Sequence, residues 1–152
     1  MPEIMPMLRI FLDSSVLFSA AYSSTGSSRD LIREAIRGNL TLVVSPEVLA
    51  ETKRNLEKKA PHVLDSYIAL LSLLKPEIVE TPSKEEVWKA EEYVDPKDSF
   101  MIAAAKKAKP DYLVTWDREH LLKVPKVAKE SGLTIITPDE LMAVIREEWS
   151  QP

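Results

Sequence analysis

Leu8-Arg9-Ile10-Phe11-Leu12-Asp13-Ser14-Ser15 is a short apolar run that ends abruptly in an acid and two serines. Such a run is typical of a buried strand whose C-terminal end carries a carboxylate. A helical stretch begins at Ser14, an amphipathic helix is expected over residues 29–38, and Leu40–Val44 is a second apolar run. The order strand, helix, strand predicts a parallel pair of strands.

The rest of the chain continues this alternation. Capping patterns predict helices that begin near residues 46, 83, 96 and 137, and a further helix is expected over 62–74. Short apolar runs predict strands over 77–80, 112–115 and 133–136. We therefore expect an α/β fold, a three-layer α/β/α sandwich with a mainly parallel central sheet. It should form a single domain over residues 8–149, preceded by an N-terminal tail of residues 1–7.

Composition excludes several classes of protein. The 152 residues are 45% hydrophobic, which is enough to form one core. The 20 basic and 24 acidic residues give a formal net charge of −4, which argues against a strongly basic nucleic-acid module but permits local basic patches. The absence of cysteine excludes disulfides, thiolate zinc sites and a cysteine nucleophile. The apolar runs are far shorter than the ~20 residues of a membrane span, so we expect a cytoplasmic protein that makes no membrane contact.

Four acids are placed to meet at one edge of the predicted sheet. Asp13 and Asp117 follow predicted strands, Asp98 lies in the first turn of a helix, and Glu51 lies in the second turn of another. In open parallel sheets, ligands bind beyond the carboxyl ends of the strands, where the strand order reverses. The sequence thus predicts that these four carboxylates converge.

Each acid also has an ordinary structural interpretation. Asp13 can end a strand or cap a helix, Asp98 can be the third-position acid of a capping box, and Asp117 can cap the turn that follows it. Glu51 can pair with Arg54, an interaction worth only ~0.2–0.5 kcal/mol. Any one of the four acids taken singly is therefore compatible with a structural role.

Taken together, the four carboxylates would repel one another. Two of them about 4 Å apart repel by ~4 kcal/mol at an effective dielectric near 20, so crowded acids favour bound cations. Mg²⁺ or Mn²⁺ fits, since these hard ions take oxygen ligands and need neither histidine nor cysteine. Two such ions ~3.5–4 Å apart would activate a water and stabilise the leaving oxygen of a phosphodiester.

Four segments, in this order, carry a family resemblance: Phe11–Leu17, Ser45–Glu51, Asp95–Phe100 and Asp111–Asp117. In them the chain resembles the PIN-domain nucleases, in particular the small prokaryotic PIN proteins that are the toxins of VapBC-type pairs. The likeness covers residues 8–141. It implies a PIN-like fold and the divalent-metal-dependent hydrolysis of RNA, sometimes of DNA, which leaves a 5′-phosphate. It also implies that an antitoxin protein is a partner and that the chain forms a homodimer.

The resemblance also assigns roles to residues. The family's metal-binding, catalytic acids carry over to Asp13, Glu51, Asp98 and Asp117. We expect the three aspartates to hold one ion, while Glu51 helps to bind a second ion or orients the water. Ser14 and Thr115 are expected to orient these acids.

The chain departs from the family at two positions. Relatives commonly have Asp-Thr-Asn where this chain has Asp13-Ser14-Ser15, which keeps hydroxyls but loses an amide. Trp116 stands where many relatives have a small or polar residue, and we favour packing over stacking on a base as its role.

Candidate substrate contacts come from basic residues spaced four apart. Arg29, Arg33 and Arg37 would form a row on one helical face that can hold phosphates, although Asp30 and Glu34 make a solvated face the simpler interpretation. The same two interpretations apply to four cations of the next helix: Lys53, Arg54, Lys58 and Lys59.

Three other polar residues have weaker claims to a role in the site. We expect Glu119 to be a solvated residue rather than an accessory acid, and His120 to be a partly exposed packing residue rather than a general base. His62 has no companion ligand in the sequence.

Two hypotheses of function remain. The first is an active metal-dependent endoribonuclease, and the second is a non-catalytic RNA- or protein-binding PIN module that needs no metal. A phosphotransferase that works through an aspartyl phosphate on Asp13 is disfavoured, because Ser15 stands where the haloacid-dehalogenase pattern requires a second aspartate. Receiver domains need an acidic pair near the first strand, which this chain also lacks.

Overall fold

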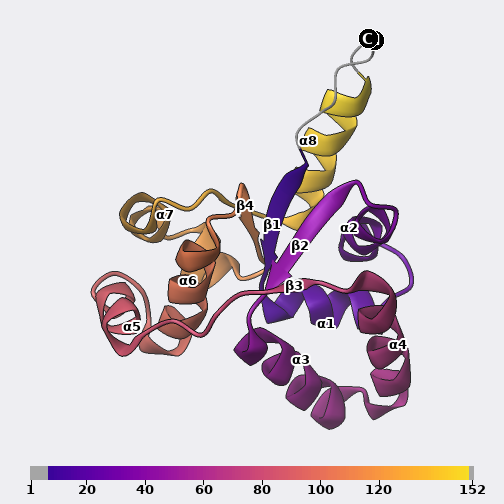
Figure 1. The fold of residues 1–152 in the computed structure, drawn as a ribbon, viewed down its shortest axis with the longest axis horizontal. Coiled ribbons are helices and arrows are strands. Elements are labelled where there is room, and N and C mark those ends of the chain that lie inside the picture. The colour runs from indigo at the N-terminus through magenta and orange to yellow at the C-terminus, as the bar shows by residue number, and fades with distance from the viewer. Residues whose placement is uncertain (1–6, 151–152) are drawn as a thin grey trace.

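The structure is a computed structural model that describes residues 7–150, and the side chains as far as residue 148. The tail expected for residues 1–7 lies, except for Met7, outside the described residues. Figure 1 shows a central sheet with α5, α6 and α7 on one side and α2 on the other, the layering that the sequence predicts.

The sheet has five strands, and every pairing in it is parallel. The strands are β1 (Leu8–Leu12), β2 (Leu40–Val44), β3 (Glu77–Ile78), β4 (Tyr112–Val114) and β5 (Ile135–Ile136). Their order across the sheet is β3-β2-β1-β4-β5. The chain leaves β1 toward β2 on one side and later returns to add β4 on the other, so the strand order reverses between β1 and β4.

Eight α-helices and two short helical turns connect the strands within the described part of the chain. The helices are α1 (Ser14–Tyr22), α2 (Ser27–Ile36), α3 (Pro46–Lys59), α4 (Leu64–Leu74), α5 (Lys84–Glu91), α6 (Pro96–Ala108), α7 (Pro125–Ser131) and α8 (Pro138–Ser150). The turns are η1 (Pro61–Val63), a 3₁₀ turn, and η2 (Arg118–Leu122), a π-helical turn. No helix among the described residues has the length and apolar character required to span a membrane.

The polar caps explain where several helices begin. The Ser45 hydroxyl accepts the N–H of Val48 at 3.1 Å, and Ser83 and Glu86 close a complete capping box at the start of α5. Thr137 and Glu140 make the same two reciprocal hydrogen bonds at the start of α8. These starts are the ones that the sequence predicts.

The start of α6 is different, and here one alternative interpretation is wrong. The Asp95 carboxylate accepts the N–H of Lys97 at 3.0 Å, whereas a capping box would pair it with the N–H of Asp98. The Asp98 N–H instead donates to the Asp95 carbonyl oxygen at 2.8 Å. The Asp98 side chain is therefore not used to cap the helix.

Several further boundaries differ from expectation. Helix α2 begins at Ser27 rather than at residue 29, and β3 and β5 have two residues each where four were expected. The helix expected over 62–74 begins as the 3₁₀ turn η1, and α4 proper starts at Leu64. Helix α7 was not predicted, although Pro125 at its first position and Gly132, with φ of 76°, at its end are ordinary start and stop signals. Its seven residues are too few for a clear apolar period.

The core lies on both faces of the sheet. Ile10, Phe11 and Leu12 of β1 are fully buried, as are Leu113 and Val114 of β4. Strands covered on both faces read as continuous apolar runs, which is why the sequence predicts them well. The N–H of Asp13 donates to the carbonyl oxygen of Val114 at 3.1 Å, so the ends of β1 and β4 are joined directly beneath the acids.

Candidate metal centre

All four predicted acids line one cavity at the carboxyl ends of β1 and β4. The cavity has a volume of about 390 Å³. Its lining consists of Asp13, Ser14, Ser15, Glu51, Lys97, Asp98, Met101, Trp116 and Asp117. The acids come from the start of α1, from α3, from the first turn of α6 and from the segment after β4, as the topology of a parallel sheet requires.

Asp13 is the most firmly held of the acids and is only 9% exposed. Its Oδ1 accepts the backbone N–H of Ser14 at 2.7 Å, and its Oδ2 accepts the hydroxyl of Thr115 at 2.7 Å and that of Ser15 at 3.1 Å. By accepting the Ser14 N–H, Asp13 caps α1, while the two hydroxyl donors fix the orientation of the carboxylate. The structural and functional interpretations of Asp13 are thus compatible.

Thr115 links two of the acids. Besides donating to Asp13, its hydroxyl oxygen accepts the backbone N–H of Asp117 at 3.0 Å, and the residue is fully buried. Ser15 extends the network, because its hydroxyl oxygen accepts the N–H of Trp116 at 3.1 Å. Ser14 and Thr115 therefore contact an acid as expected, and Ser15, to which the sequence assigned no such role, does so as well.

Asp98 has an environment that does not suit a negative charge. Its Oδ2 is buried and has no hydrogen-bond partner among the described residues. Burial raises the pKa of its carboxyl to about 6, and the carboxylates of Asp117 and Asp13 add to this effect, while Lys97 and His120 oppose it. A buried carboxylate oxygen that lacks a donor and has acids as neighbours is an environment that a bound cation would stabilise.

Asp117 caps a turn through one of its two carboxylate oxygens. Its Oδ1 accepts the N–H of His120 at 3.0 Å, so it caps η2 as the structural interpretation predicts. His120 Nδ1 lies 3.3 Å from this same oxygen and 3.3 Å from Lys97 Nζ. Asp98, Asp117 and His120 each offer a ligand atom within 4.8 Å of the others, a spacing that permits one ion to contact all three.

Glu51 stands at the rim of the cavity. It is exposed, and no ion pair joins it to Arg54 among the described residues, so the ordinary interpretation of Glu51 finds no support. The buried Ser45 cap fixes the start of α3, and Thr52 donates to the Val48 carbonyl oxygen at 2.8 Å within the first turns. Glu51 is thus carried by a helix with a well-anchored start, and its own side chain makes no hydrogen bond or ion pair with the described residues.

The donors present fit a hard divalent ion. Carboxylate oxygens from three aspartates and one glutamate suit Mg²⁺ or Mn²⁺, and the single imidazole of His120 is compatible with Mn²⁺. The uncompensated Oδ2 of Asp98 is a second and independent reason to expect a positive charge at this position. The residues of the cavity therefore suit a divalent cation of this class.

Trp116 packs as expected. Its ring lies against the main core, and its indole N–H donates to the buried hydroxyl of Ser28 at 2.9 Å. The same residue also contributes to the cavity lining. The hydrogen bond to Ser28 fixes the ring, so Trp116 forms a rigid wall of the site.

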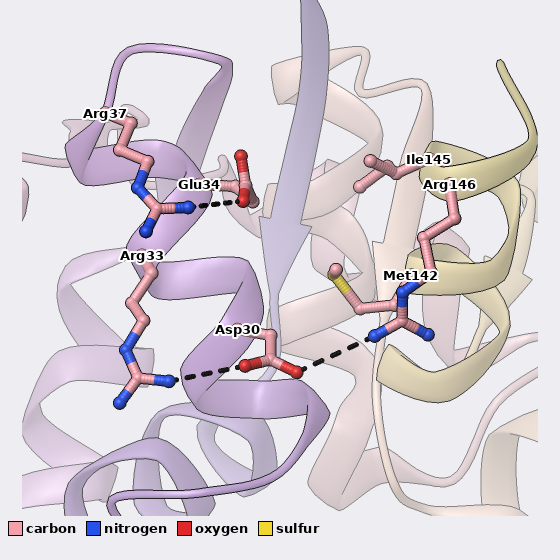
Figure 2. Close-up of a pocket in the computed structure, with 7 residues that line it drawn as sticks. All are labelled: Asp30, Arg33, Glu34, Arg37, Met142, Ile145 and Arg146. Atoms are coloured by element: carbon pink, nitrogen blue, oxygen red, sulfur yellow. Dashed lines mark hydrogen bonds and ion pairs between the residues drawn. The ribbon is translucent and has the colours of Figure 1, made fainter. Parts of the chain in front are cut away.

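The arginine row lies away from the acids. Figure 2 shows Arg33 of α2, and Arg37 directly after this helix, among the residues that line a second cavity, of about 330 Å³, to which α8 contributes Met142, Ile145 and Arg146. Arg33 pairs with Asp30 at 3.4 Å, and Arg37 pairs with Glu34 at 3.0 Å. Arg29 donates from Nε to the Ala20 carbonyl oxygen at 2.8 Å, at the end of α1. Among the lining residues of the acidic cavity there is no member of this row.

Two residues have a larger part in the site than the sequence suggests. Lys97 lines the acidic cavity, and His120 completes the cluster with Asp98 and Asp117. The available signals were the position of Lys97 immediately before Asp98 and the three-residue spacing of His120 from Asp117, which a capped turn brings together. Glu119 is exposed, as expected, and lies outside the cavity lining. His62, which has no companion ligand in the sequence, is also exposed and lies outside that lining.

Several solved structures share this fold. The chain is similar to PAE2754 from Pyrobaculum aerophilum, with 18% sequence identity and a TM-score of 0.63 over 92% of this chain and 90% of that one. It is also similar to DNA-bound VapBC from Salmonella typhimurium, with 16% identity and a TM-score of 0.64 over 87% and 99% of the two chains. VapC20 from Mycobacterium tuberculosis, a toxin that cleaves the sarcin-ricin loop, has 15% identity and a TM-score of 0.50 over 72% and 91%.

At these identities the solved structures establish the fold alone. Among curated proteins, none has a significant match to the chain. A family model described as the PIN domain matches residues 9–119, a segment that includes all four acids of the cavity. Since this match spans well over half of the residues, the chain belongs to the PIN domain family.

Proposed function

We propose that this protein is a divalent-metal-dependent endoribonuclease that hydrolyses RNA phosphodiester bonds. The observation that carries the proposal is the buried Oδ2 of Asp98, which lacks a donor and lies among the carboxylates of Asp13 and Asp117. Maintaining such an arrangement costs stability unless a cation binds there. Members of the PIN domain family are typically nucleases, and this chain has a cluster of acids where the fold brings its strand ends together.

Each residue has a defined part in the proposal. Asp13, Asp98 and Asp117 would hold one Mg²⁺ or Mn²⁺, and Glu51, which is exposed at the rim, would help to bind a second ion or orient the attacking water. When bound, these ions supply charge neutralisation for the phosphodiester and lower the pKa of the attacking water. Ser14, Ser15 and Thr115 hold the Asp13 carboxylate in one orientation through the hydrogen bonds that they donate.

Lys97 and His120 are suited to the phosphate. Both lie beside the acids, with Lys97 Nζ 3.3 Å from His120 Nδ1, and Lys97 is exposed at the cavity. A lysine in this position can contact a phosphate oxygen of the substrate as a point charge. It also offsets part of the negative charge that would otherwise repel a polyanion at this rim.

The relatives suggest partners for the protein. VapBC from Salmonella typhimurium and VapC20, the sarcin-ricin-loop-cleaving toxin, share the fold at low identity. We accordingly propose that this chain is the toxin of a toxin–antitoxin pair, that an antitoxin protein binds it, and that it forms a homodimer. RNA as substrate agrees with the cytoplasmic location that the sequence favours.

The decisive experiment measures RNA cleavage together with metal binding. Labelled single-stranded RNA is incubated with the purified protein and Mn²⁺ or Mg²⁺, and Mn²⁺ uptake is followed by calorimetry. We expect cleavage to 5′-phosphate ends by the wild type, and a loss of about 100-fold or more in Asp98→Asn together with weakened metal uptake. Asp65→Asn, which removes an exposed carboxylate on α4, is the matched control and should behave as wild type.

Two results would contradict the proposal. Intact RNA in every metal, with no difference between wild type and Asp98→Asn, would favour the alternative of a non-catalytic RNA- or protein-binding PIN module. Cleavage that persists undiminished in Asp98→Asn would indicate a contaminating ribonuclease or a site elsewhere in the chain.

A further inference from the structure

A strip of aromatic and basic side chains leads away from the acidic cavity along α1 and α3. On α1, Ser15 lines the cavity, and Phe18 and Tyr22 follow it on the same helical face, three and seven residues later. On α3, Glu51 lines the cavity, and Lys59 follows two turns later on that side. Both helices thus carry one residue of the cavity and, further along, a side chain of this group.

The two helices meet at a group of three rings and one lysine. We call this group the aromatic strip and define it as Phe18, Tyr22, Lys59 and His62. The Phe18 and Tyr22 rings stack with centroids 6.0 Å apart and an interplanar angle of 9°. His62 meets Tyr22 edge-on at 6.4 Å, and Lys59 Nζ lies 5.9 Å from the centroid of Phe18. Side chains from α1, α3 and η1 therefore form one contiguous surface.

Only part of this surface has a role in the core. Phe18 is half-buried and packs against a small cluster formed by Ala21, Leu56, Ala60 and Tyr67. Tyr22 is outside that cluster and remains 59% exposed, although it has ring neighbours on two sides. Lys59 and His62 are exposed as well, and Lys59 forms no ion pair with the described residues.

The arginines of α2 and α8 offer a weaker surface for an anion. Arg33 and Arg146 both approach the carboxylate of Asp30, at 3.4 and 3.9 Å, and Arg37 approaches Glu34 (Figure 2). A phosphate would have to compete with these carboxylates. The aromatic strip combines an unpaired cation with the exposed ring of Tyr22, and it lies on helices that also contribute residues to the cavity.

We infer that the aromatic strip binds single-stranded RNA by stacking a nucleobase on Tyr22, while Lys59 contacts the adjoining phosphate. This inference deepens the proposed function and rests on it, since RNA is its substrate. Every base has a π-face, and aromatic side chains beside basic ones bind single strands without strict sequence preference. Tyr22 lies seven residues along α1 from Ser15, roughly 10 Å, or about three nucleotides of stacked strand from the cavity.

The strip favours RNA over a protein partner for two reasons. Its exposed part is one tyrosine edged by a lysine and a histidine, which suits a base next to a phosphate more than an apolar segment of a protein. Its two rings on α1 also lie about one and two helical turns beyond Ser15, which lines the cavity where the phosphodiester would be cut, so one strand of RNA can reach both sites. Protein docking at this surface is the competing outcome of the test.

The test measures binding separately from cleavage. Fluorescence anisotropy with a labelled twelve-nucleotide single-stranded RNA, in EDTA, gives the Kd of the wild type and its variants without hydrolysis. We expect Tyr22→Ala to raise the Kd about 5- to 150-fold, the effect of losing one stacked base, and Tyr22→Phe to restore binding. Trp88→Ala removes a similarly exposed aromatic, 60% exposed on α5, and should leave the Kd unchanged.

A second pair of variants tests the lysine. Lys59→Gln should lower the slope of log Kd against log salt concentration by about 0.7, the value for one phosphate contact in single-stranded nucleic acid. Lys126→Gln on the exposed surface of α7, a helix that contributes nothing to the strip or the cavity, should not change it. All of these side chains are exposed, so the variants are expected to fold, and their melting temperatures verify it.

Each outcome gives a definite answer. If the wild type cleaves RNA but Tyr22→Ala binds it as tightly as the wild type does, the inference is wrong, the proposed function stands, and the strip is left for a protein partner. If Tyr22 is needed for binding but no metal supports cleavage, the inference holds and the proposed nuclease activity fails. If the wild type neither binds nor cleaves RNA, both are wrong.

Discussion

Asp98 is the residue whose charge the surrounding structure opposes most. Its carboxyl is partly buried at the N-terminal end of α6, one of its oxygens has no partner among the described residues, and its pKa is raised to about 6 from 3.8. The first cause is burial, followed by the neighbouring carboxylates of Asp117 and Asp13. In the protein without metal this aspartate therefore lowers the stability of the fold.

The stability of the metal-free protein should respond to removing that charge. Because the pKa of Asp98 is higher in the folded protein than in the unfolded chain, its destabilising effect is absent below about pH 4, grows as the pH rises, and is complete above about pH 6. We expect Asp98→Asn in EDTA to melt about 2–4 °C higher than wild type at pH 7.5, the shift for roughly 1 kcal/mol in a chain of this size. The difference should disappear at pH 4.

Differential scanning fluorimetry across this pH range checks the prediction, with the exposed Asp65→Asn as the control. Equal melting temperatures of wild type and Asp98→Asn at pH 7.5 would show that neither burial nor the neighbouring acids disfavour the charged Asp98 in the folded protein. A lower melting temperature in the variant would mean that the Asp98 carboxylate has a net favourable interaction in the folded protein.

At the scale of the elements, the start of α3 determines where Glu51 stands. Ser45 is fully buried at the end of β2, and its hydroxyl caps α3 by accepting the N–H of Val48. The same type of cap begins α5, where Ser83 and Glu86 form a capping box, but α5 contributes no residue to the cavity. Both helices thus begin with a serine cap, but only α3 carries a residue of the cavity.

Replacing the two caps should separate stability from activity. Ser45→Ala and Ser83→Ala each remove a cap worth about 1 kcal/mol, so both should lower the melting temperature by about 2–4 °C. Only Ser45→Ala should also reduce RNA cleavage, by about tenfold, because it loosens the helix that carries Glu51. The rates are compared well below both melting temperatures, and equal activity of the two variants would rule out a positioning role for the Ser45 cap.

At the scale of the whole molecule, the site joins parts of the chain that are distant in sequence. Asp13, Glu51, Asp98 and Asp117 come from four separate elements, and they meet because the strand order β3-β2-β1-β4-β5 reverses between β1 and β4. An ion that binds all of these elements stabilises the folded state as a unit, because the unfolded chain holds the ligands far apart.

Adding metal should therefore raise the melting temperature of the entire protein. At a free Mg²⁺ or Mn²⁺ concentration 100 times the Kd, linkage gives about 2.7 kcal/mol, which corresponds to about 5–10 °C here. Asp13→Asn should abolish most of this rise, whereas Asp65→Asn should keep it. A melting temperature that stays constant as either metal is titrated would argue against a metal centre in this cavity.

Much of the fold could be predicted because its signals are local. Buried parallel strands read as apolar runs, as in Ile10–Leu12, and the serine caps at residues 45 and 83 depend on contacts within four residues. The boundaries that were missed have weak local signals, since α7 is seven residues long and η1 is a single tight turn. The four acids could be proposed as a set because they follow strands or begin helices at the same sheet edge.

Charge, burial and mutual contact are decided only in three dimensions. The sequence around Asp98 suggests a capping box, yet its carboxyl lies among Asp13 and Asp117, and that environment sets its pKa. Likewise Lys59 and His62 become neighbours of the Phe18 and Tyr22 rings only when α3 and η1 pack on α1. Hydrogen bonds along the backbone and apolar periodicity act over a few residues, whereas desolvation and Coulomb energies depend on groups brought together from anywhere in the chain.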